Sequence, residues 1–222
     1  MSNLIGICGF IGSGKDTVAK MFVEQGCVQD SFAAPLKDMC SSIFGWDRDL
    51  LEGDTTHSRE FRETTDLYWT SKLGIDKFTP RLALQLLGTD IIRTHFSQDM
   101  WLNSLEYRIR KQRQEEICVV VSDARFKNEL NLIKDLGGVV IHVKRTELPE
   151  WYDSAVWANN GSIIAQKTME TKYSHIHASE WKWVGYEFDY EIENTGTLSD
   201  LEASVLKICV DLENNTDIQV SK

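Results

Sequence analysis

The stretch Leu4-Ile-Gly-Ile-Cys-Gly-Phe-Ile-Gly-Ser-Gly-Lys-Asp-Thr-Val-Ala-Lys20 decides how the rest of this chain is interpreted. Its apolar run, Leu4 to Cys8, has the length of a buried strand, a glycine-rich turn follows from Gly9 to Gly14, and Lys15 opens a helix. Glycines let consecutive backbone N–H groups turn inward, and a helix N-terminus attracts anions. Strand, glycine loop and helix in this order therefore predict a loop that binds the phosphates of a nucleotide.

The candidate phosphate ligands lie in this loop and in the first helical turn. Lys15 would reach the outer phosphates, and a hydroxyl residue usually follows the lysine and lies next to Mg²⁺. Here Asp16 takes that position and Thr17 comes one residue later. Asp16 can act as a partner of the helix dipole or face a phosphate through Mg²⁺ or water, and the sequence leaves both open. The predicted phosphate-binding set is Gly9, Gly12, Ser13, Gly14, Lys15, Asp16 and Thr17.

Composition predicts a soluble, acidic, globular protein. The 222 residues suffice for one sizeable core, and we expect a single domain spanning residues 1–222. With 24 Lys and Arg against 34 Asp and Glu, the net charge is −10, which disfavours binding to the phosphates of nucleic acids. The N-terminus does not resemble a signal peptide, and no apolar run is long enough to span a membrane. We therefore expect a cytoplasmic protein.

The cysteines are odd in number and scattered, and no pair has C-x-x-C spacing. This pattern predicts neither a zinc site nor a disulfide framework, and we expect reduced thiols. The five are Cys8, Cys27, Cys40, Cys118 and Cys209.

Apolar strands and amphipathic helices alternate along most of the chain, which predicts an open, mostly parallel sheet covered on both faces. The core comprises about residues 1–45, 79–145 and 186–213. Residues 46–78 are polar and charged, and we expect a mobile surface excursion with one short helix. Residues 146–185 hold four tryptophans and lose the α/β rhythm; a core or interface role for these rings is favoured. We expect the tail from residue 214 to be frayed. The further expected strands are 27–33, 117–121, 139–143 and 188–192. Five further helices are expected: one from Leu36 to Gly45, one that begins at Pro80, one that begins at Asp99, one that contains Leu130 and Ile133, and one from Ser199 to Leu212.

Charged residues follow two more of the predicted strands. Asp123 and Arg125 come directly after the apolar run 117–121, and Arg145 ends the run 139–143. Ligands of parallel sheets bind beyond the carboxyl ends of the strands, so we expect these residues to converge with Lys15. Asp123 would then associate with Mg²⁺ and Arg125 would clamp a phosphoryl group. The alternatives are a helix cap for Asp123 and a surface arginine for Arg125.

Short motifs recur in order from residue 4 to about 205. They are GFIGSGKDT at 9–17, FAAPLK at 32–37, LGTD at 87–90 with Trp101 beyond it, SDAR at 122–125, VIHVKR at 140–145, HASEW at 177–181 and IENTGTL at 192–198. In order and spacing they resemble the deoxynucleoside monophosphate kinases of bacteriophages. A more distant likeness is to phosphomevalonate kinases, which share the Gly-Lys-Asp loop and the Asp-x-Arg pair.

The resemblance implies a P-loop kinase-like fold of three α/β/α layers. It implies transfer of the γ-phosphoryl group of ATP, with Mg²⁺, to a deoxynucleoside 5′-monophosphate. It also suggests a homodimer. From the net charge and the lack of a long apolar run we expect neither a nucleic-acid nor a membrane partner. Such an acceptor is largely dianionic at neutral pH, so no general base is needed.

The residue roles that follow from the resemblance and from position fall into four groups. The catalytic residues are Lys15, Asp123 and Arg125, and the ligands of Mg²⁺, direct or through water, are Thr17, Asp16 and Asp123. The acceptor-binding residues are Lys37, Arg81, Thr89, Asp90, Arg93 and Trp101. A lid of about residues 146–185 is expected, and the residues assigned to the lid and to nucleotide binding are Arg145, His177, Glu180 and Asn194, with Lys167 and Lys172 as further lid candidates.

Three points stay open at this stage. Gly88 in an apolar helical stripe either admits a ligand or breaks the helix, and the basic run 108–113 either complements a helix end or binds a ligand. A structural or hydrogen-bonding role is favoured over metal binding for His175 and His177. Three rival functions remain. The first is a kinase acting on a hydroxyl or on a non-nucleotide phosphate (dephospho-CoA- or phosphomevalonate-kinase-like), and a hydroxyl acceptor would need Asp30 as its base. The others are a nucleotide-dependent switch and a passive nucleotide-binding module.

Overall fold

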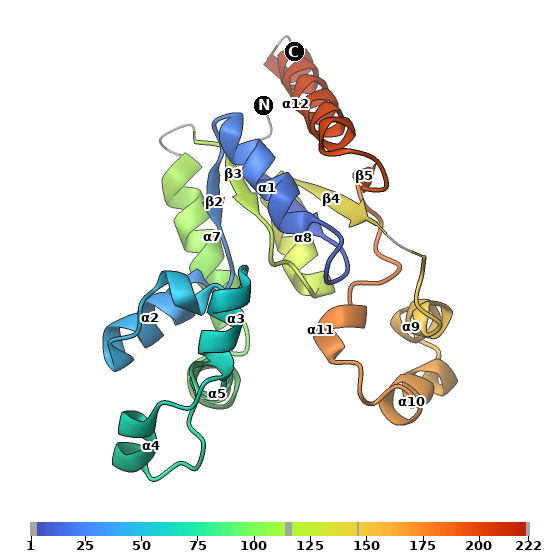
Figure 1. Ribbon diagram of the computed structural model, residues 1–222. Helices are drawn as coiled ribbons and strands as arrows, with labels where there is room; N and C mark the ends of the chain where they lie inside the picture. Colours follow the sequence, from blue (N-terminus) through green and yellow to red (C-terminus); the bar gives the residue numbers. More distant parts are fainter. Residues whose placement is uncertain (1–3, 114–116, 146, 221–222) are drawn as a thin grey trace. The chain divides into compact units, whose positions relative to one another are not determined.

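A computed structural model describes residues 4–113, 117–145 and 147–220 (Figure 1). The chain divides into two compact units. The first unit comprises Met1–Ser31 and Glu106–Lys222, and the second comprises Phe32–Leu105.

The first unit is built on a five-stranded sheet with the strand order β2-β3-β1-β4-β5. All four strand pairs are parallel, which confirms the prediction of an open parallel sheet. Parallel strands place their carboxyl ends at one edge, and the loops after β1, β3 and β4 leave from that edge. The strands are β1 (Leu4–Cys8), β2 (Val28–Asp30), β3 (Val119–Val121), β4 (Val139–Lys144) and β5 (Tyr190–Glu193).

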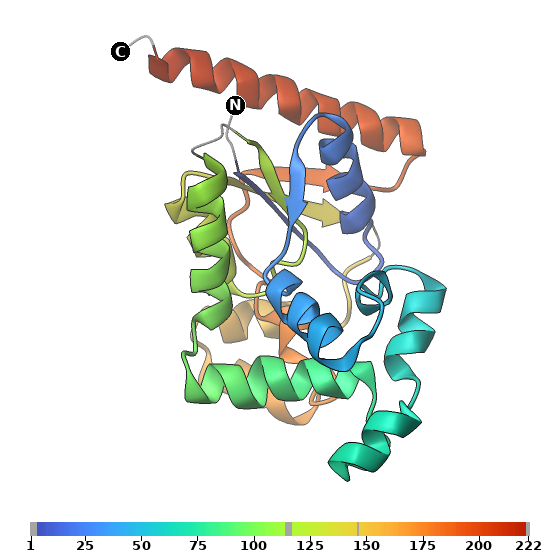
Figure 2. The ribbon, with the colours of Figure 1, turned by 90° about the vertical axis from the view of Figure 1, so that its left-hand side faces the viewer.

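Helices cover both faces of this sheet. Ile5 and Ile7 point to one face, where they share a buried cluster with residues of α1 (Lys15–Glu24) and α12 (Leu198–Val220). Gly6, between them, faces α8 (Lys127–Asp135): a Cβ there would lie 2.4 Å from Ile133 Cδ1. Figure 2 shows α12 as a long continuous helix. The arrangement confirms the predicted three-layer α/β/α fold.

The register of β2 and β3 overturns one prediction about the cysteines. Val28 pairs with Val119, so Cys27 and Cys118, one residue earlier in each strand, lie side by side with their Cα atoms 4.5 Å apart. They form a disulfide across the two parallel strands. Five reduced thiols were expected, and that expectation is wrong for this pair because spacing along the chain does not reveal strand register.

The segment between β4 and β5 is helical and packs through aromatic rings. It contains α9 (Tyr152–Asn159), α10 (Ile163–Thr171) and α11 (Ala178–Trp181). Trp151, Trp181 and Trp183 are buried, which confirms a core role for them, whereas Trp157 is 64% exposed. The ring of Phe10, in the glycine loop, lies 4.7 Å from that of Trp183 and 5.5 Å from that of Trp151, centroid to centroid. The segment is thus anchored to the loop that follows β1.

The second unit is helical and has its own core. Its cluster includes Trp46, Leu51 and Phe78. The prediction that residues 46–78 form a surface excursion with one short helix is therefore wrong, because part of this segment is core. Two α-helices form there, with Thr55 and Asp66 as N-caps whose side chains accept from Ser58 N and Trp69 N. The elements are α2 (Ala34–Phe44), η1 (Asp49–Leu51), α3 (Thr56–Glu63), α4 (Leu67–Leu73), α5 (Pro80–Gln85), η2 (Leu86–Ile91, a π-helix) and α6 (Ile92–His95).

Two further boundaries differ from expectation. The β2 strand ends at Asp30, before the predicted 33, and α12 continues to Val220, so a tail frayed from residue 214 is wrong up to that residue. The helix α7 (Met100–Arg113) runs from the second unit into the first. Within the described part of the chain, no helix combines the length and apolarity that crossing a bilayer would require.

Candidate phosphate-binding and phosphoryl-transfer site

The loop between β1 and α1 is held in a shape that requires glycine. Gly14 has φ of 101°, and a Cβ there would lie 2.3 Å from Asn194 Nδ2. Gly9 has φ of 152°, and a Cβ there would lie 2.4 Å from Val143 O on the neighbouring strand β4. Both backbones lie where an L side chain would be strained and crowded. The glycines predicted to bind phosphate therefore have a structural reason in this loop.

Asn194, just after β5, clamps the loop to the sheet. Its Nδ2 donates to Ser13 O at 2.9 Å, and its backbone N–H donates to Lys144 O at 2.6 Å. Ser13 Oγ is buried, and among the described residues it has no hydrogen-bond partner. Buried hydroxyls normally find a partner, and a phosphate oxygen in the loop would supply one.

Lys15 lies at the first residue of α1, and its ammonium group turns back over the loop. Its Nζ donates to Phe10 O at 2.7 Å. The pKa of Lys15 is lowered from 10.5, first by burial and then by the positive charge of Arg125, while Asp16 opposes the shift. Arg125 thus lies near enough for its charge to act on the Lys15 ammonium group, in agreement with their places at neighbouring strand ends.

The loop after β3 carries Asp123 and Arg125. The N-cap of α8 is Phe126, three residues beyond Asp123, so the alternative of Asp123 as the helix cap is wrong. Glu129 instead binds the backbone at the start of this helix. The Oε2 atom of its buried side chain accepts from the backbone N–H of Arg125 at 2.7 Å and from that of Phe126 at 3.2 Å. Arg125 Nη1 donates in turn to Glu180 Oε1 at 2.8 Å. Arg125 is therefore fixed at both its backbone and its guanidinium group.

The oxygen atoms near the loop suit a magnesium ion. Asp16 and Thr17 are exposed in the first turn of α1, and Asp123 is half-buried beyond β3. Carboxylates and hydroxyls are the hard ligands Mg²⁺ takes, and it is usually held by one or two carboxylates together with substrate phosphates. The residues present therefore fit a magnesium–nucleotide complex.

The segment predicted as a lid contributes residues of two kinds. Arg145, after β4, is exposed and donates through Nη1 to Gly12 O at 3.4 Å. His177 Nδ1 accepts from Ser179 N and caps α11, which confirms a structural role for this histidine. Lys172 Nζ donates to Tyr173 OH at 2.7 Å, and Lys167 is exposed on α10. Movement of this segment as a lid stays a prediction.

The predicted acceptor-binding residues all lie in the second unit. Lys37 Nζ pairs with Glu52, and Arg81 Nη1 donates to Glu63 Oε1 at 2.9 Å. Thr89 and Asp90 are exposed in the π-helix, and Arg93 is half-buried on α6. Trp101 is buried. Their role in binding an acceptor stays a prediction.

Gly88 has a packing role that neither sequence interpretation anticipated. A Cβ there would lie 2.6 Å from Leu36 Cδ2 of α2, so the glycine allows the π-helix to pack closely on that helix. The Gly88 carbonyl accepts from Trp101 Nε1 at 2.9 Å. The indole N–H is therefore used within the fold and is not available to a ligand.

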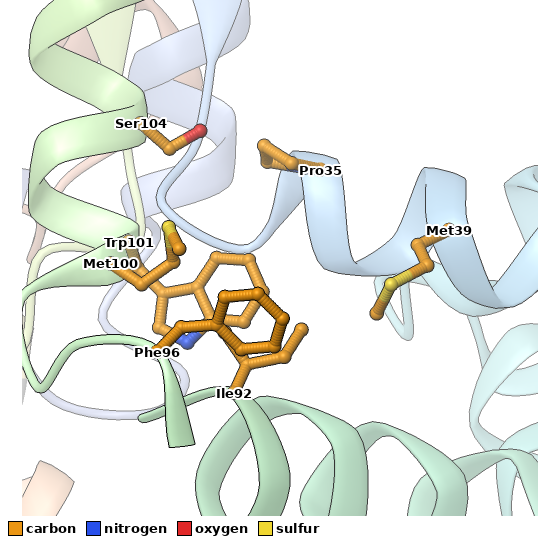
Figure 3. Close-up of a pocket in the computed structure, with 7 residues that line it drawn as sticks. All are labelled: Pro35, Met39, Ile92, Phe96, Met100, Trp101 and Ser104. Carbon is orange, nitrogen blue, oxygen red and sulfur yellow. The ribbon is translucent and has the colours of Figure 1, made fainter. Parts of the chain in front are cut away.

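A pocket of about 240 Å³ opens beside this ring (Figure 3). Side chains from α2, from the α6 region and from the start of α7 surround it, and Ser104 carries the one hydroxyl among the lining side chains. The apolar lining includes two thioethers and two aromatic rings, which suits a flat ring better than a charged group. The lining residues are Pro35, Met39, Ile92, Phe96, Met100, Trp101 and Ser104.

Asp30, the base required by a kinase with a hydroxyl acceptor, is already engaged. Arg108 Nε donates to Asp30 Oδ2 and Arg108 Nη2 to Asp30 Oδ1, both at 2.9 Å. Both oxygens of the Asp30 carboxylate thus accept from one guanidinium group, in a bidentate, charge-assisted pair. This also shows that Arg108, in the predicted basic run, makes a specific ion pair instead of complementing the helix end.

Two residues of the site were missed from the sequence. Glu129 gave no clear signal, because the capping-box signature has Ser, Thr, Asp or Asn at the N-cap and Phe126 takes that position here. Phe10 gave no signal, since its carbonyl meets Lys15 and its ring meets Trp183 only in the folded chain.

A glycine loop between a parallel strand and a helix, with Lys15 and Arg125 beside it, defines a P-loop phosphotransferase. The family model described as deoxynucleotide monophosphate kinase matches residues 46–157. A protein of Acanthamoeba polyphaga mimivirus whose description names a deoxynucleotide monophosphate kinase is 33% identical over 190 residues, covering 78% of this chain and 93% of its own. This chain belongs to the deoxynucleotide monophosphate kinase family.

Two other similarities are more distant. The deoxynucleoside-5′-monophosphate kinase of Escherichia phage T5 is 28% identical over 186 residues, covering 61% of this chain and 73% of its own. Among solved structures, dephospho-CoA kinase from Campylobacter jejuni is similar with a TM-score of 0.46 and 14% identity, over 94% of this chain and 96% of its own. Similarity at that level does not enter the family assignment.

Proposed function

We propose that this protein transfers the γ-phosphoryl group of ATP to a deoxynucleoside 5′-monophosphate, giving the diphosphate. The observation that carries the proposal is the Lys15 ammonium group folded back over the glycine loop, 2.7 Å from Phe10 O, in a chain of this family. Phosphoryl transfer to a phosphate monoester needs two polyanions to be held together and their charge neutralised, and little covalent chemistry from the protein.

The donor side of the reaction is assigned to the first unit. The backbone N–H groups of the loop and the N-terminus of α1 would receive the β- and γ-phosphates. Lys15 would leave Phe10 O and follow the γ-phosphoryl oxygens, and Arg125 would neutralise charge as the group transfers. Bound Mg²⁺ would neutralise phosphate charge, held by Asp123 with Asp16 and Thr17 as direct or water-mediated ligands.

The acceptor side is assigned to the second unit. The pocket beside Trp101 would take the nucleobase, because its apolar and aromatic lining favours stacking over hydrogen-bond readout. Lys37, Arg81 and Arg93 would hold the acceptor phosphate, with Lys37 exchanging Glu52 for it. Thr89 and Asp90, in the exposed turn, would contact the sugar or phosphate.

A coupled assay over deoxynucleoside monophosphates, dephospho-CoA and mevalonate phosphate tests the function. We expect turnover with at least one deoxynucleotide and none with the other two acceptors. Lys15→Met and Arg125→Ala should each lower kcat/KM by about 10²-fold or more, the order seen when a transition-state charge contact is lost. Unchanged kinetics in either variant contradicts the role given to that residue.

A second variant tests the pocket. Phe96 is 74% exposed in the free protein and lines the pocket, so Phe96→Ala should leave the fold intact. We expect the KM for the acceptor to rise about 5- to 100-fold, the range for losing one base–aromatic contact, with the KM for ATP unchanged. Tyr107→Ala is the matched control, since that ring is 73% exposed on α7 and outside the pocket. An acceptor KM that does not respond to Phe96→Ala places the base elsewhere.

A further inference from the structure

Arg125 is bound by a carboxylate from a distant part of the first unit. Its Nη1 donates to Glu180 Oε1 at 2.8 Å, and the two residues are separated by the whole of α8, β4, α9 and α10. The Glu180 side chain is 20% exposed and that of Arg125 41% exposed. An ion pair at this partial burial is held more firmly than a pair on the open surface, where solvent screens it.

The backbone around Glu180 is fixed by its neighbours. The next residue, Trp181, is buried, and its carbonyl accepts from Asn159 Nδ2 at 2.8 Å. Trp183 is fully buried and packs against Phe10 of the glycine loop. The carbonyl of Phe10 is the acceptor for Lys15 Nζ. The buried residues that follow Glu180 in the chain thus fix the position of its carboxylate, and one of them, Trp183, also packs against the glycine loop.

Two cations face the glycine loop, and they repel one another. The charge of Arg125 lowers the pKa of Lys15, second only to burial, and Glu180 acts in the opposite direction. A guanidinium group has five N–H donors, of which Glu180 takes one through Nη1. Within the part of the chain that the structure describes, Glu180 is the one hydrogen-bond partner of this guanidinium group, so its remaining donors can be directed at phosphoryl oxygens. Without an anion behind it, Arg125 would move away from Lys15 into solvent.

We propose that Glu180 is a positioning residue that holds the Arg125 guanidinium next to Lys15 in the orientation needed for phosphoryl transfer. Glu180 acts through Arg125 and does not touch the nucleotide. The inference rests on the proposed function for its kinetic consequences, but the ion pair itself can be tested without any substrate.

The kinetic test is a double-mutant cycle. Glu180→Ala should lower kcat about 10- to 100-fold while the KM for ATP stays within about 3-fold, because an orienting contact matters most as charge develops. Glu180→Gln should lose less, since its amide oxygen still accepts a hydrogen bond. In an Arg125→Ala background both substitutions should have no further effect on kcat. Glu170→Gln, an exposed glutamate on α10, is the matched control and should behave as wild type.

Two results would overturn the proposal. One is a Glu180→Ala effect of equal size with and without Arg125, which would mean that Glu180 acts directly on substrate or on the fold; thermal melting of each variant separates those two. The other is an unaltered kcat in Glu180→Ala with Arg125 present.

A measurement without substrate separates this proposal from the proposed function. The NMR resonance of the Arg125 Nε–H group can be assigned because it is missing in Arg125→Ala. It should report an ordered side chain in wild type and a side chain that averages over several conformations in Glu180→Ala. If wild type phosphorylates no deoxynucleotide, the proposed function fails, and this resonance alone decides whether Glu180 fixes Arg125. A resonance unchanged by Glu180→Ala contradicts the positioning role.

Discussion

Gly14→Ala is the substitution whose effect follows most directly from the geometry of the loop. The new Cβ would lie 2.3 Å from Asn194 Nδ2, so the side chain that clamps the loop through Ser13 O must move. The backbone at Gly14 has φ of 101°, which an alanine adopts only with strain. The substitution therefore acts on the loop conformation in two independent ways.

The magnitude is the sum of these two effects. Holding a non-glycine residue in such a backbone conformation costs about 1–3 kcal/mol. Loss of the hydrogen bond from Asn194 adds about 0.5–1.5 kcal/mol. The loop conformation that receives phosphates is thus disfavoured by about 1.5–4.5 kcal/mol, and the affinity for ATP should fall about 10- to 2 × 10³-fold.

The assay is titration of ATP against wild type, Gly14→Ala and Gly26→Ala, with urea unfolding of each. Gly26 has φ of 97°, and nothing lies within 4 Å of a Cβ built there, so it reproduces the backbone strain away from the loop. We expect Gly26→Ala to lose stability but to bind ATP as wild type. If Gly14→Ala binds ATP within about 3-fold of wild type, the glycine loop is not the phosphate site.

Three further predictions follow from other parts of the first unit. Burial and then the charge of Arg125 lower the pKa of Lys15 from 10.5, so Lys15 should lose its proton, and ATP binding should weaken, at a pH below 10.5. Arg125→Ala should move this loss of binding to higher pH. A pH profile that does not shift contradicts the influence of Arg125 on Lys15. Burial lowers the pKa of His142 from 6.5 to about 4. Between these two pH values the histidine is protonated in the unfolded chain but neutral in the folded chain. The free energy of unfolding should fall by up to about 3 kcal/mol as pH drops from 6.5 to 4, and urea unfolding of His142→Phe should lack that part of the slope. Titration of thiols in denaturant without reductant should find three per chain, since Cys27 and Cys118 are paired; five would contradict the disulfide.

The sequence predicted the parts of the fold that depend on local patterns. The strand Leu4–Cys8, the glycine loop and the helix from Lys15 were located to the residue, because an apolar run, positive-φ glycines and a helix start are all written in consecutive residues. The convergence of Arg125 with Lys15 followed from the rule that parallel strands end at one edge. These predictions needed no knowledge of side-chain packing.

The rest of the site depends on contacts that only the folded chain makes. Within residues 46–78 the buried side chains Trp46, Leu51 and Phe78 have no helical or strand period among the charges around them, so that segment was mistaken for surface. The disulfide depends on the register of β2 with β3. The pairing of Arg125 with Glu180 joins residues 55 positions apart and has no signature in either motif.

The most direct test of the central claim follows the transferred group itself. The purified protein is incubated with ATP labelled at the γ-phosphate, Mg²⁺ and one deoxynucleoside monophosphate at a time, and the products are separated by charge. We expect the label to appear in the β-position of a deoxynucleoside diphosphate, and Lys15→Met and Arg125→Ala to abolish its transfer. Label found only in inorganic phosphate, at a rate that no monophosphate changes, would contradict it and indicate a nucleotide-dependent switch.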